Sequence, residues 1–368
     1  MKSVLVALSA GAALLLTACG GSPTGTNPST GGAGVPAPPT ASLTGAGATF
    51  PKPFYDAANF AYNKKFSQVT INYGGGGSGA GIQQLTKKVV DFGASDVPVS
   101  SKEADAMGGS DKVIQIASTL GTESLAYNLD GVADGQLKLT PDTIAGIFLG
   151  KIKKWNDPAM AADNSGVSLP NQDIHVIHRS DGSGTTYIFT DYLCSVSADW
   201  KAKTGGPGKS ITWPTGDGAQ GNAGVATRIT QTPGAIGYVE LAYVLQTKMK
   251  QAALKNRDGN FVIPSAAGAT AAAKAFVGSS PSQFSIVNAS GKDSAPISGY
   301  SWIILYKDQA DKTKGTALVD YLYWLTTAEG QQYAVNLHYA ALPSSMASYD
   351  LLVLKGVTSG GSALLSVS

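Results

Sequence analysis

Residues 174–185 read Ile-His-Val-Ile-His-Arg-Ser-Asp-Gly-Ser-Gly-Thr, and a helical pattern follows over 185–196. A short β-rich run therefore leads through a glycine-rich turn directly into a helix. Strand-like and helix-like stretches alternate in the same way along the chain: β-rich runs occur at Val69–Tyr73, Val89–Phe92 and Trp302–Tyr306, and helical patterns at 51–66, 80–88, 141–148, 222–231 and 315–337. Such alternation is typical of parallel sheets with crossover helices. We predict an α/β fold.

The composition narrows the class of protein. The chain has 368 residues, of which 43% are hydrophobic and 14% charged, and it contains 45 glycines. This fits one large or two ordinary domains with a real core, and excludes a disordered or coiled-coil chain. The formal net charge is only +2 and no basic block interleaves with aromatics, so we expect no nucleic-acid partner. With three histidines and two cysteines, we expect no metal site, disulfide or cofactor.

The N-terminus has the pattern of an export signal. Lys2 precedes an apolar stretch, Val4–Leu16, that is too short to span a bilayer, and Leu16-Thr-Ala-Cys19 resembles the cleavage box of bacterial lipoproteins. We predict a signal peptide at 1–18, a diacylated (palmitate-bearing) Cys19, and a Gly/Ser/Pro/Thr-rich tether within 19–41. The alternative is an ordinary signal peptide in which Cys19 is incidental. The mature protein is expected to be exported and anchored to a bacterial membrane, facing the periplasm or the cell exterior.

Three segments share one design, a glycine-rich turn with a hydroxyl residue that opens into a helix. They are Gly45-Ala-Gly-Ala-Thr-Phe-Pro51, Tyr73-Gly-Gly-Gly-Gly-Ser-Gly-Ala-Gly81 and Arg179-Ser-Asp-Gly-Ser-Gly-Thr185. The first N–H groups of a helix lack intrahelical partners and the helix dipole favours an anion there, while glycine lets the backbone approach an oxyanion closely. One such turn alone is an ordinary helix start. Three converging turns, one with an arginine, indicate a site for a tetrahedral oxyanion.

Two charged residues sharpen this hypothesis. Arg179 can hold two oxygens of an anion in a fork, or it can pair with Asp181; the two are compatible if Asp181 holds the guanidinium in place. Asp96 should repel an anion unless the ligand carries a proton to donate. Hydrogen phosphate does and sulfate does not, so a buried Asp96 would select phosphate. The alternative is a turn or capping role for Asp96 before Val97-Pro98.

Two other patterns suggest different chemistry. Gly216-Asp-Gly-Ala-Gln-Gly221 matches a dinucleotide fingerprint, but the acidic residue expected beyond it is missing, so we interpret it as a structural loop. Ser183 could be the nucleophile of a secreted phosphatase. However, the Gly182-Ser-Gly184 context is too short for a nucleophile elbow, and His175 and His178 lie just upstream with no evident role as a base. We therefore expect no enzyme activity.

Several long motifs, in order, resemble the phosphate-binding proteins of bacterial ABC-type phosphate importers, the PstS family. The resemblance covers nearly all of the predicted mature domain and is carried by five segments: Leu43–Pro51, Asp91–Asp96, Gly150–Asn156, Arg179–Thr185 and Pro233–Glu240. It implies a two-domain periplasmic-binding-protein fold of type II, each domain a mostly parallel sheet flanked by helices, with the ligand cleft between them. Domain I would comprise 42–118 plus 297–368 and domain II 119–296, with hinge strands near Ser118–Tyr127 and Ile297–Tyr306.

The resemblance also implies which residues bind phosphate. Asp96 would accept the proton of the ligand, Arg179 would supply charge, and Asp181 would hold Arg179. The implied phosphate contacts are Thr49, Phe50, Ser78, Asp96, Arg179, Ser183, Gly184 and Thr185. One departure is the second turn, which reads Gly77-Ser78-Gly79 where the family often has two serines in a row.

By the same resemblance, the function is high-affinity capture of inorganic phosphate outside the cytoplasmic membrane. The protein would close by a hinge motion around the ion and deliver it to an ABC-type permease and its ATPase complex, as a monomer. The alternative is a receptor for another tetrahedral oxyanion. Arsenate is the hardest to exclude because it also carries a proton, whereas sulfate and molybdate would not need Asp96.

Overall fold

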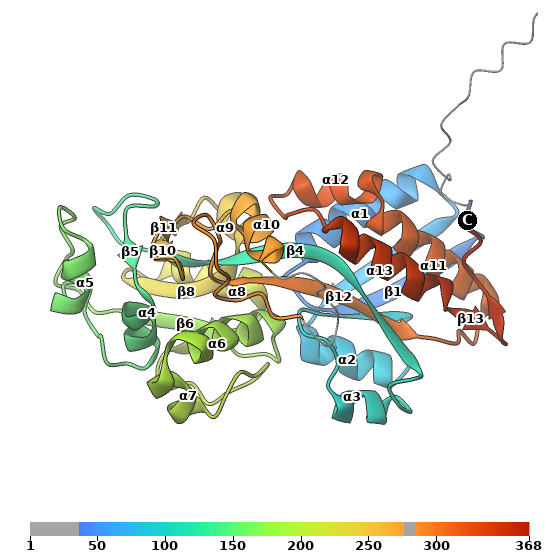
Figure 1. Ribbon diagram of the computed structural model, residues 1–368, viewed down its shortest axis with the longest axis horizontal. Coiled ribbons are helices and arrows are strands. Elements are labelled where there is room, and N and C mark those ends of the chain that lie inside the picture. Colours follow the sequence, from blue (N-terminus) through green and yellow to red (C-terminus); the bar gives the residue numbers. More distant parts are fainter. Residues whose placement is uncertain (1–36, 276–283, 368) are drawn as a thin grey trace, which may run out of the picture. The chain divides into compact units, whose positions relative to one another are not determined.

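The computed structural model describes residues 37–275 and 284–367 (Figure 1). The predicted signal peptide, Cys19 and most of the predicted tether lie outside these residues. The first strand begins at Ala41, next to the predicted end of the tether. Among the described residues, no helix has both the length and the apolar character needed to cross a membrane.

The strands alternate with helices along most of the chain. The strands are β1 Ala41–Gly47, β2 Val69–Gly75, β3 Phe92–Ser95, β4 Val113–Tyr127, β5 Lys138–Leu139, β6 His175–Arg179, β7 Asp217–Ala219, β8 Ala235–Glu240, β9 Lys250–Gln251, β10 Ala253–Lys255, β11 Phe261–Val262, β12 Ser298–Tyr306, β13 Thr358–Ser359 and β14 Ser362–Ala363. The helices are α1 Lys52–Lys65, α2 Ser78–Thr86, α3 Ser101–Ala106, α4 Pro141–Phe148, α5 Pro158–Asp163, α6 Gly184–Val196, α7 Ala198–Thr204, α8 Gly221–Gln231, α9 Leu241–Gln246, α10 Ala266–Lys274, α11 Lys312–Thr326, α12 Ala328–Val335 and α13 Ser344–Lys355.

The largest sheet of the described residues has nine strands, and two small sheets, β11-β10-β5 and β13-β14, lie apart from it. Its order is β2-β1-β3-β12-β4-β8-β6-β7, with β9 beside β4. The strands at its two ends pair in parallel, as the alternation of strands and helices predicts: β1 with β2 and β3, and β6 with β7 and β8. In the middle, β12 pairs antiparallel with β3 and β4, and β4 pairs antiparallel with β8.

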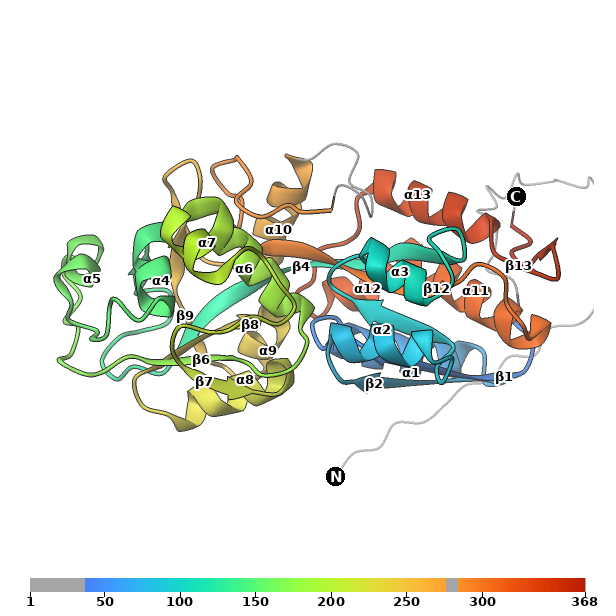
Figure 2. The same ribbon diagram turned by 90° about the horizontal axis from the view of Figure 1, so that it is seen from below.

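Helices gather around the two ends of this sheet and define two lobes, the two domains of the fold (Figures 1 and 2). We call lobe I the part built from β1–β3, α1–α3 and α11–α13, and lobe II the part built from β5–β8 and α4–α10. The long strands β4 and β12 run side by side from one lobe to the other. They include the segments in which the sequence analysis expects hinge strands.

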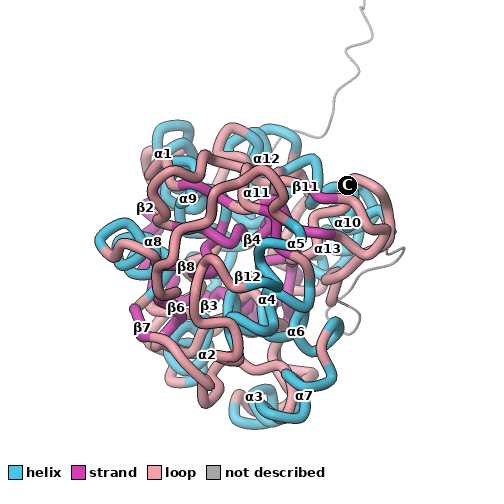
Figure 3. Tube along the Cα trace, turned by 90° about the vertical axis from the view of Figure 1, so that its left-hand side faces the viewer, coloured by secondary structure: helices cyan, strands magenta, loops and turns pink. Residues whose placement is uncertain are grey.

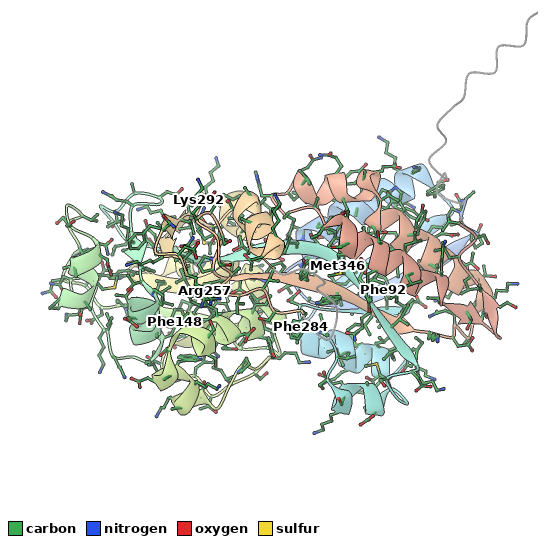
Figure 4. The ribbon with its side chains drawn as sticks, in the orientation of Figure 1. Phe92, Phe148, Arg257, Phe284, Lys292 and Met346 are labelled. Carbon is green, nitrogen blue, oxygen red and sulfur yellow. The ribbon has the colours of Figure 1, made fainter. Side chains whose placement is uncertain are left out.

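The core follows from this layout, because strands covered by helices must be apolar on their buried faces (Figure 3). The largest buried side chains include Trp155, Trp200, Trp302 and Trp324. Figure 4 labels Phe92 in lobe I and Phe148 in lobe II, and both belong to one continuous cluster of buried residues. The described residues therefore form a core that continues through the hinge strands.

Two predicted elements differ from the structure. The strand predicted at Val89–Phe92 begins only at Phe92, because the chain turns at Lys88, where φ is 57°, and Val89 is exposed. The helix predicted at 315–337 is two helices, α11 and α12. They are separated by Thr327, whose hydroxyl accepts a hydrogen bond from the Gly330 N–H and so caps α12.

Candidate functional site

The three glycine-rich turns all end at the N-terminus of a helix, as predicted. The first leads into α1, which begins at Lys52 directly after Pro51. The second leads into α2, whose first residue is Ser78. In the third, Ser183 caps α6 by accepting a hydrogen bond from the Thr186 N–H at 3.0 Å. The turns bring helix N-termini from both lobes into one region, where backbone N–H groups favour an anion.

Hydrogen bonds to the hydroxyl of Ser78 connect the two lobes in this region. Its hydroxyl accepts hydrogen bonds from the Gly184 N–H at 3.0 Å and from the Asp96 N–H at 3.2 Å. Next to it, the Gly79 N–H donates to the Gly182 carbonyl across the lobes at 2.9 Å. The first turn of α2 and the first turn of α6 therefore lie in direct contact.

Close contact between the lobes explains one glycine of the second turn, Gly77, and one of the third turn, Gly184. A side chain at Gly77, whose φ is 90°, would lie 2.2 Å from Asp181 Oδ2 and 2.7 Å from the Gly182 carbonyl. At Gly184, an added Cβ would lie 2.5 Å from Asp96 Cβ and 2.6 Å from Ser78 Oγ. Contacts this short need glycine. At Gly79, by contrast, an added Cβ would lie 3.4 Å from Gly182 Cα, which is ordinary contact.

Asp96 is buried between the hinge and the second turn. Its carboxylate accepts hydrogen bonds from the hydroxyl of Ser301 on β12 and, at 3.5 Å, from that of Ser78. Burial raises its pKa to about 7, although these hydrogen bonds and the charge of Arg179 oppose the rise. Because a raised pKa means that the carboxylate takes up a proton readily, this placement is compatible with the predicted role of Asp96 as a proton acceptor. It argues against a simple turn-capping role.

Arg179 ends β6 and is almost fully buried. Its guanidinium makes a two-point ion pair with Asp181, in which Nε lies 2.7 Å from Oδ1 and Nη2 contacts Oδ2. Burial by itself raises the pKa of Asp181, but the hydrogen bonds and charge of Arg179 outweigh it and the pKa is lowered. Asp181 also accepts the Gly221 N–H at 3.0 Å. The predicted pairing of Arg179 and Asp181 is thus confirmed, and Nη1 remains directed at the Thr185 hydroxyl at 3.1 Å.

Asn222 is a site residue that the sequence did not reveal. It is fully buried near the N-terminus of α8 and bridges the lobes. Its backbone N–H and its Nδ2 each donate to Thr49 Oγ1 at 3.1 Å, and Nδ2 also lies 3.1 Å from Thr185 Oγ1. The segment Gly216–Gly221 was interpreted as a structural loop. It leads into α8 and so supplies a fourth glycine-rich helix start, and this shared design is the signal that could have identified Asn222.

These contacts fix the direction of two hydroxyl groups. A hydroxyl has two acceptor lone pairs and one hydrogen to donate. Thr49 Oγ1 accepts two hydrogen bonds from Asn222, and Thr185 Oγ1 accepts one each from Arg179 and Asn222. Because their lone pairs are occupied, both hydroxyls can only donate. The region therefore offers hydrogen-bond donors to a ligand, and the carboxylate of Asp96 is a hydrogen-bond acceptor beside them.

Phe50 can contribute only its backbone. Its ring is fully buried against Gly121 of β4, where an added Cβ would lie 2.7 Å from it, and against Tyr339. The Tyr339 hydroxyl lies 2.7 Å from the Phe50 carbonyl oxygen and 3.0 Å from Glu240 Oε2, so these two acceptors share its single hydrogen. This arrangement leaves the Phe50 N–H as its possible contact with a ligand.

The two histidines upstream of Ser183 and the cysteine of α6 can also be placed. His178 stacks on Trp213 with ring centroids 4.6 Å apart, and its Nδ1 lies 3.0 Å from the Arg179 carbonyl oxygen, while His175 is exposed. Cys194 is a free thiol, partly buried against the core. Within the described residues, no group of three His, Cys, Asp or Glu side chains could hold a metal ion.

Comparison with known proteins places the chain in a family. The model of the PBP superfamily domain matches residues 33–329. The phosphate-binding protein PstS of Xylella fastidiosa (strain Temecula1) is 41% identical over 345 residues, which cover 91% of this chain and 92% of the relative. The corresponding protein of Pasteurella multocida is 42% identical over 307 residues, covering 83% of this chain and 87% of the relative.

Solved structures agree at the level of the fold. A high-affinity periplasmic phosphate-binding protein with bound phosphate is 24% identical and superposes with a TM-score of 0.66, covering 86% of this chain and 99% of that one. A phosphate-binding protein from Stenotrophomonas maltophilia is 20% identical with a TM-score of 0.64, covering 84% and 92%. Both similarities support the two-lobed α/β fold described above. The chain therefore belongs to the PBP superfamily and, within it, to the PstS family of phosphate-binding proteins.

Proposed function

We propose that this protein binds one inorganic phosphate ion between its two lobes and delivers it to an ABC-type phosphate permease. The observation that carries the proposal is the polarity of the site. The hydroxyls of Thr49 and Thr185 can only donate, helix N-termini supply further donors, and buried Asp96 accepts. Such a site suits a tetrahedral anion that accepts many hydrogen bonds and donates one.

The proposed contacts come from both lobes. From lobe I, Thr49 contributes its hydroxyl, and Thr49 and Phe50 contribute backbone N–H groups. Ser78 contributes the start of a helix, and Asp96 is the proton acceptor. From lobe II, Arg179 contributes charge, with Asp181 holding it in place. The third turn completes the set with Ser183, Gly184 and Thr185. The Ser183 hydroxyl accepts from the Thr186 N–H as the α6 cap, so its hydrogen is available to the ligand.

A ligand held by both lobes stabilises their contact, and this is the basis for closure. Without phosphate the lobes would separate by bending at β4 and β12, and the ion would favour the closed form because it binds both lobes at once. We assign domain I to 42–118 plus 297–368 and domain II to 119–296, so that the boundaries fall within or next to the hinge strands. The closed monomer would then dock on the permease and its ATPase complex.

We further propose that the protein works outside the cytoplasmic membrane and has no enzyme activity of its own. Residues 1–18 would be removed as a signal peptide, and two acyl chains on Cys19 would be sufficient for stable anchoring. The remaining tether would let the lobes reach the permease. Labelling of cells with a palmitate analogue, with a Cys19→Ser variant for comparison, tests the anchor independently of phosphate binding.

Calorimetry with phosphate and sulfate tests the binding function. The unmodified protein should bind phosphate and should bind sulfate at least about a thousandfold more weakly, because sulfate has no proton for Asp96 and would leave two negative groups unpaired. Asp96→Asn replaces the acceptor with a neutral amide and should narrow this ratio by at least about tenfold. Asp56→Asn, on the surface of α1 in an ion pair with Lys52, is the matched control. Equal affinities of the unmodified protein for phosphate and sulfate would overturn the assignment.

Arsenate distinguishes the proposal from its main alternative. It has the geometry and the proton of phosphate, so the contacts described here should accept both ions. A receptor for arsenate would bind it more tightly than phosphate in direct competition. We expect phosphate to be bound at least as tightly.

A further inference from the structure

Glu123 is a buried carboxyl group that none of the proposed phosphate contacts involves. It lies in the hinge strand β4 and is fully buried. Among the described residues, neither of its carboxylate oxygens has a hydrogen-bond partner. The other acidic groups of this region are different: Asp96 and Asp181 accept hydrogen bonds at both oxygens, and Glu240 at one. Buried polar groups are rarely left unpaired without a functional reason.

The strand geometry places Glu123 on the side of the site. Side chains alternate along a strand, so Glu123 and Gly121 are on the same face of β4. At Gly121 this face touches the ring of Phe50 in the first turn. The Glu123 N–H donates to the Ile297 carbonyl, on the side away from β8. Its pairing with Glu240 on β8 is therefore of the non-hydrogen-bonded type, in which the side chains are closest.

The groups around Glu123 belong to the anion site. Glu240 on β8 pairs directly with Glu123, and the charges of Asp96 after β3 and Arg179 at the end of β6 also act on its carboxyl group, which in turn acts on the Tyr238 hydroxyl. Four other titratable groups of the elements packed on β4 have partners elsewhere. Asp350 of α13 accepts a hydrogen bond from the Ala117 N–H, and Lys250 of β9 donates one to the Leu129 carbonyl. Tyr243 of α9 donates to the Thr49 carbonyl, and Arg228 of α8 is exposed near Asp217.

A charged Glu123 is unfavourable in this position. Burial raises its pKa well above the ordinary value, Asp96 and Glu240 raise it further, and Arg179 only partly offsets them. An anion bound beside Arg179 would add another negative charge and oppose ionisation more strongly. In a lobe-open form, by contrast, water would reach the carboxyl and it would ionise at neutral pH.

We propose that Glu123 is a further binding residue, which enters the phosphate site from the hinge strand as a neutral carboxylic acid and ties binding to the uptake of one proton. This inference rests on the proposed function. The proton comes from the solvent and stays on Glu123, whose O–H donates to a phosphate oxygen. Asp96 separately accepts the proton that hydrogen phosphate already carries. No covalent bond is made or broken.

The pH dependence follows from this balance. Above neutral pH, the free ligand is hydrogen phosphate and free Glu123 is ionised, so each binding event takes up one proton. The affinity should then fall about tenfold per pH unit. Below neutral pH, free phosphate already carries a second proton, so the dependence on pH flattens. A Glu123→Gln variant keeps the shape and a donor but cannot ionise, and its affinity should be nearly constant above neutral pH.

The test is calorimetric titration with inorganic phosphate at slightly alkaline pH in buffers of different ionisation enthalpy, which counts the protons taken up. The unmodified protein should take up about one proton more than Glu123→Gln. Asp350→Asn removes another buried carboxyl that contacts β4 and should leave the count unchanged. Equal counts for the unmodified protein and Glu123→Gln would overturn the inference while leaving phosphate binding intact. If Glu123→Gln fails to fold, the number of protons taken up by the unmodified protein still tests the inference, because uptake of no protons would overturn it. Failure of the unmodified protein to bind phosphate would overturn the proposed function, and this inference with it.

Discussion

Gly184 offers a sharp test of how tightly the two lobes meet. It is the first residue of α6, and its N–H donates to Ser78 Oγ in the other lobe at 3.0 Å. A methyl group at this position would lie 2.5 Å from Asp96 Cβ and 2.6 Å from both Asp96 Oδ2 and Ser78 Oγ. Real Cβ contacts are essentially never shorter than 3.0 Å. Ser78 and Asp96 are buried and hydrogen-bonded, so they cannot easily move aside.

Gly184→Ala should destabilise the closed form relative to the open form. Overpacking a close-packed interior costs about 1–3 kcal/mol, and if the lobes separate without ligand the open form avoids the clash. Phosphate affinity should therefore drop about 5- to 150-fold, while the melting temperature of the unliganded protein changes little. Isothermal calorimetry measures the first quantity and thermal unfolding the second.

A second glycine provides the control for this experiment. Gly224 lies in α8, and its added Cβ would have its nearest neighbour at an ordinary 3.7 Å. Gly224→Ala should bind phosphate like the unmodified protein. If Gly184→Ala bound phosphate with unchanged affinity, the close contact of α6 with Ser78 and Asp96 would not be a feature of the ligand-bound state, and the reasoning would be refuted.

Two further predictions concern lobe contact and pH. Lys209 in lobe II forms an ion pair with Glu103 in lobe I, and both side chains are partly buried. Lys209→Gln should therefore weaken phosphate binding about 2- to 5-fold at low salt and less at high salt. Lys151 pairs with Asp199 in its own lobe, so Lys151→Gln should have no effect in the same titrations. Burial raises the pKa of Asp96 to about 7 and that of Glu240 to about 8, so the folded state holds protons more tightly than the unfolded chain. If these groups stay buried without ligand, the melting temperature of the unliganded protein should fall as pH rises from about 5 to 8, with a shallower fall in Asp96→Asn; a rise over this range would contradict their burial.

The sequence predicts those parts of the site whose structure depends only on neighbouring residues. A glycine-rich turn followed by a hydroxyl residue determines its own helix start, because capping and positive φ involve only neighbouring residues. Ser78 and Ser183 are therefore found at helix N-termini as predicted. The ion pair of Arg179 with Asp181 spans only two residues and was foreseeable for the same reason.

Other features depend on contacts between distant segments. β3 starts at Phe92 and contains Gly93, Ala94 and Ser95, which have little strand propensity. It is a strand because it is buried between β1 and β12, and tertiary burial outweighs local preference. Asn222 and Glu123 belong to the site only because α8 and β4 are brought against the first turn. The glycine-rich start of α8 is a local signal for Asn222, but nothing in the sequence around Glu123 specifies its position.

The charges of the site explain how a chain of net charge +2 can be suited to an anion. Arg179 is largely neutralised by Asp181, and the nearby acids Asp96, Glu123 and Glu240 all have raised pKa values. Direct charge attraction therefore contributes little. Fixed N–H dipoles at four helix starts, together with hydroxyls whose lone pairs are already occupied, supply the attraction. Since every oxyanion benefits equally from these donors, discrimination between anions must come from Asp96, which requires a proton on the ligand.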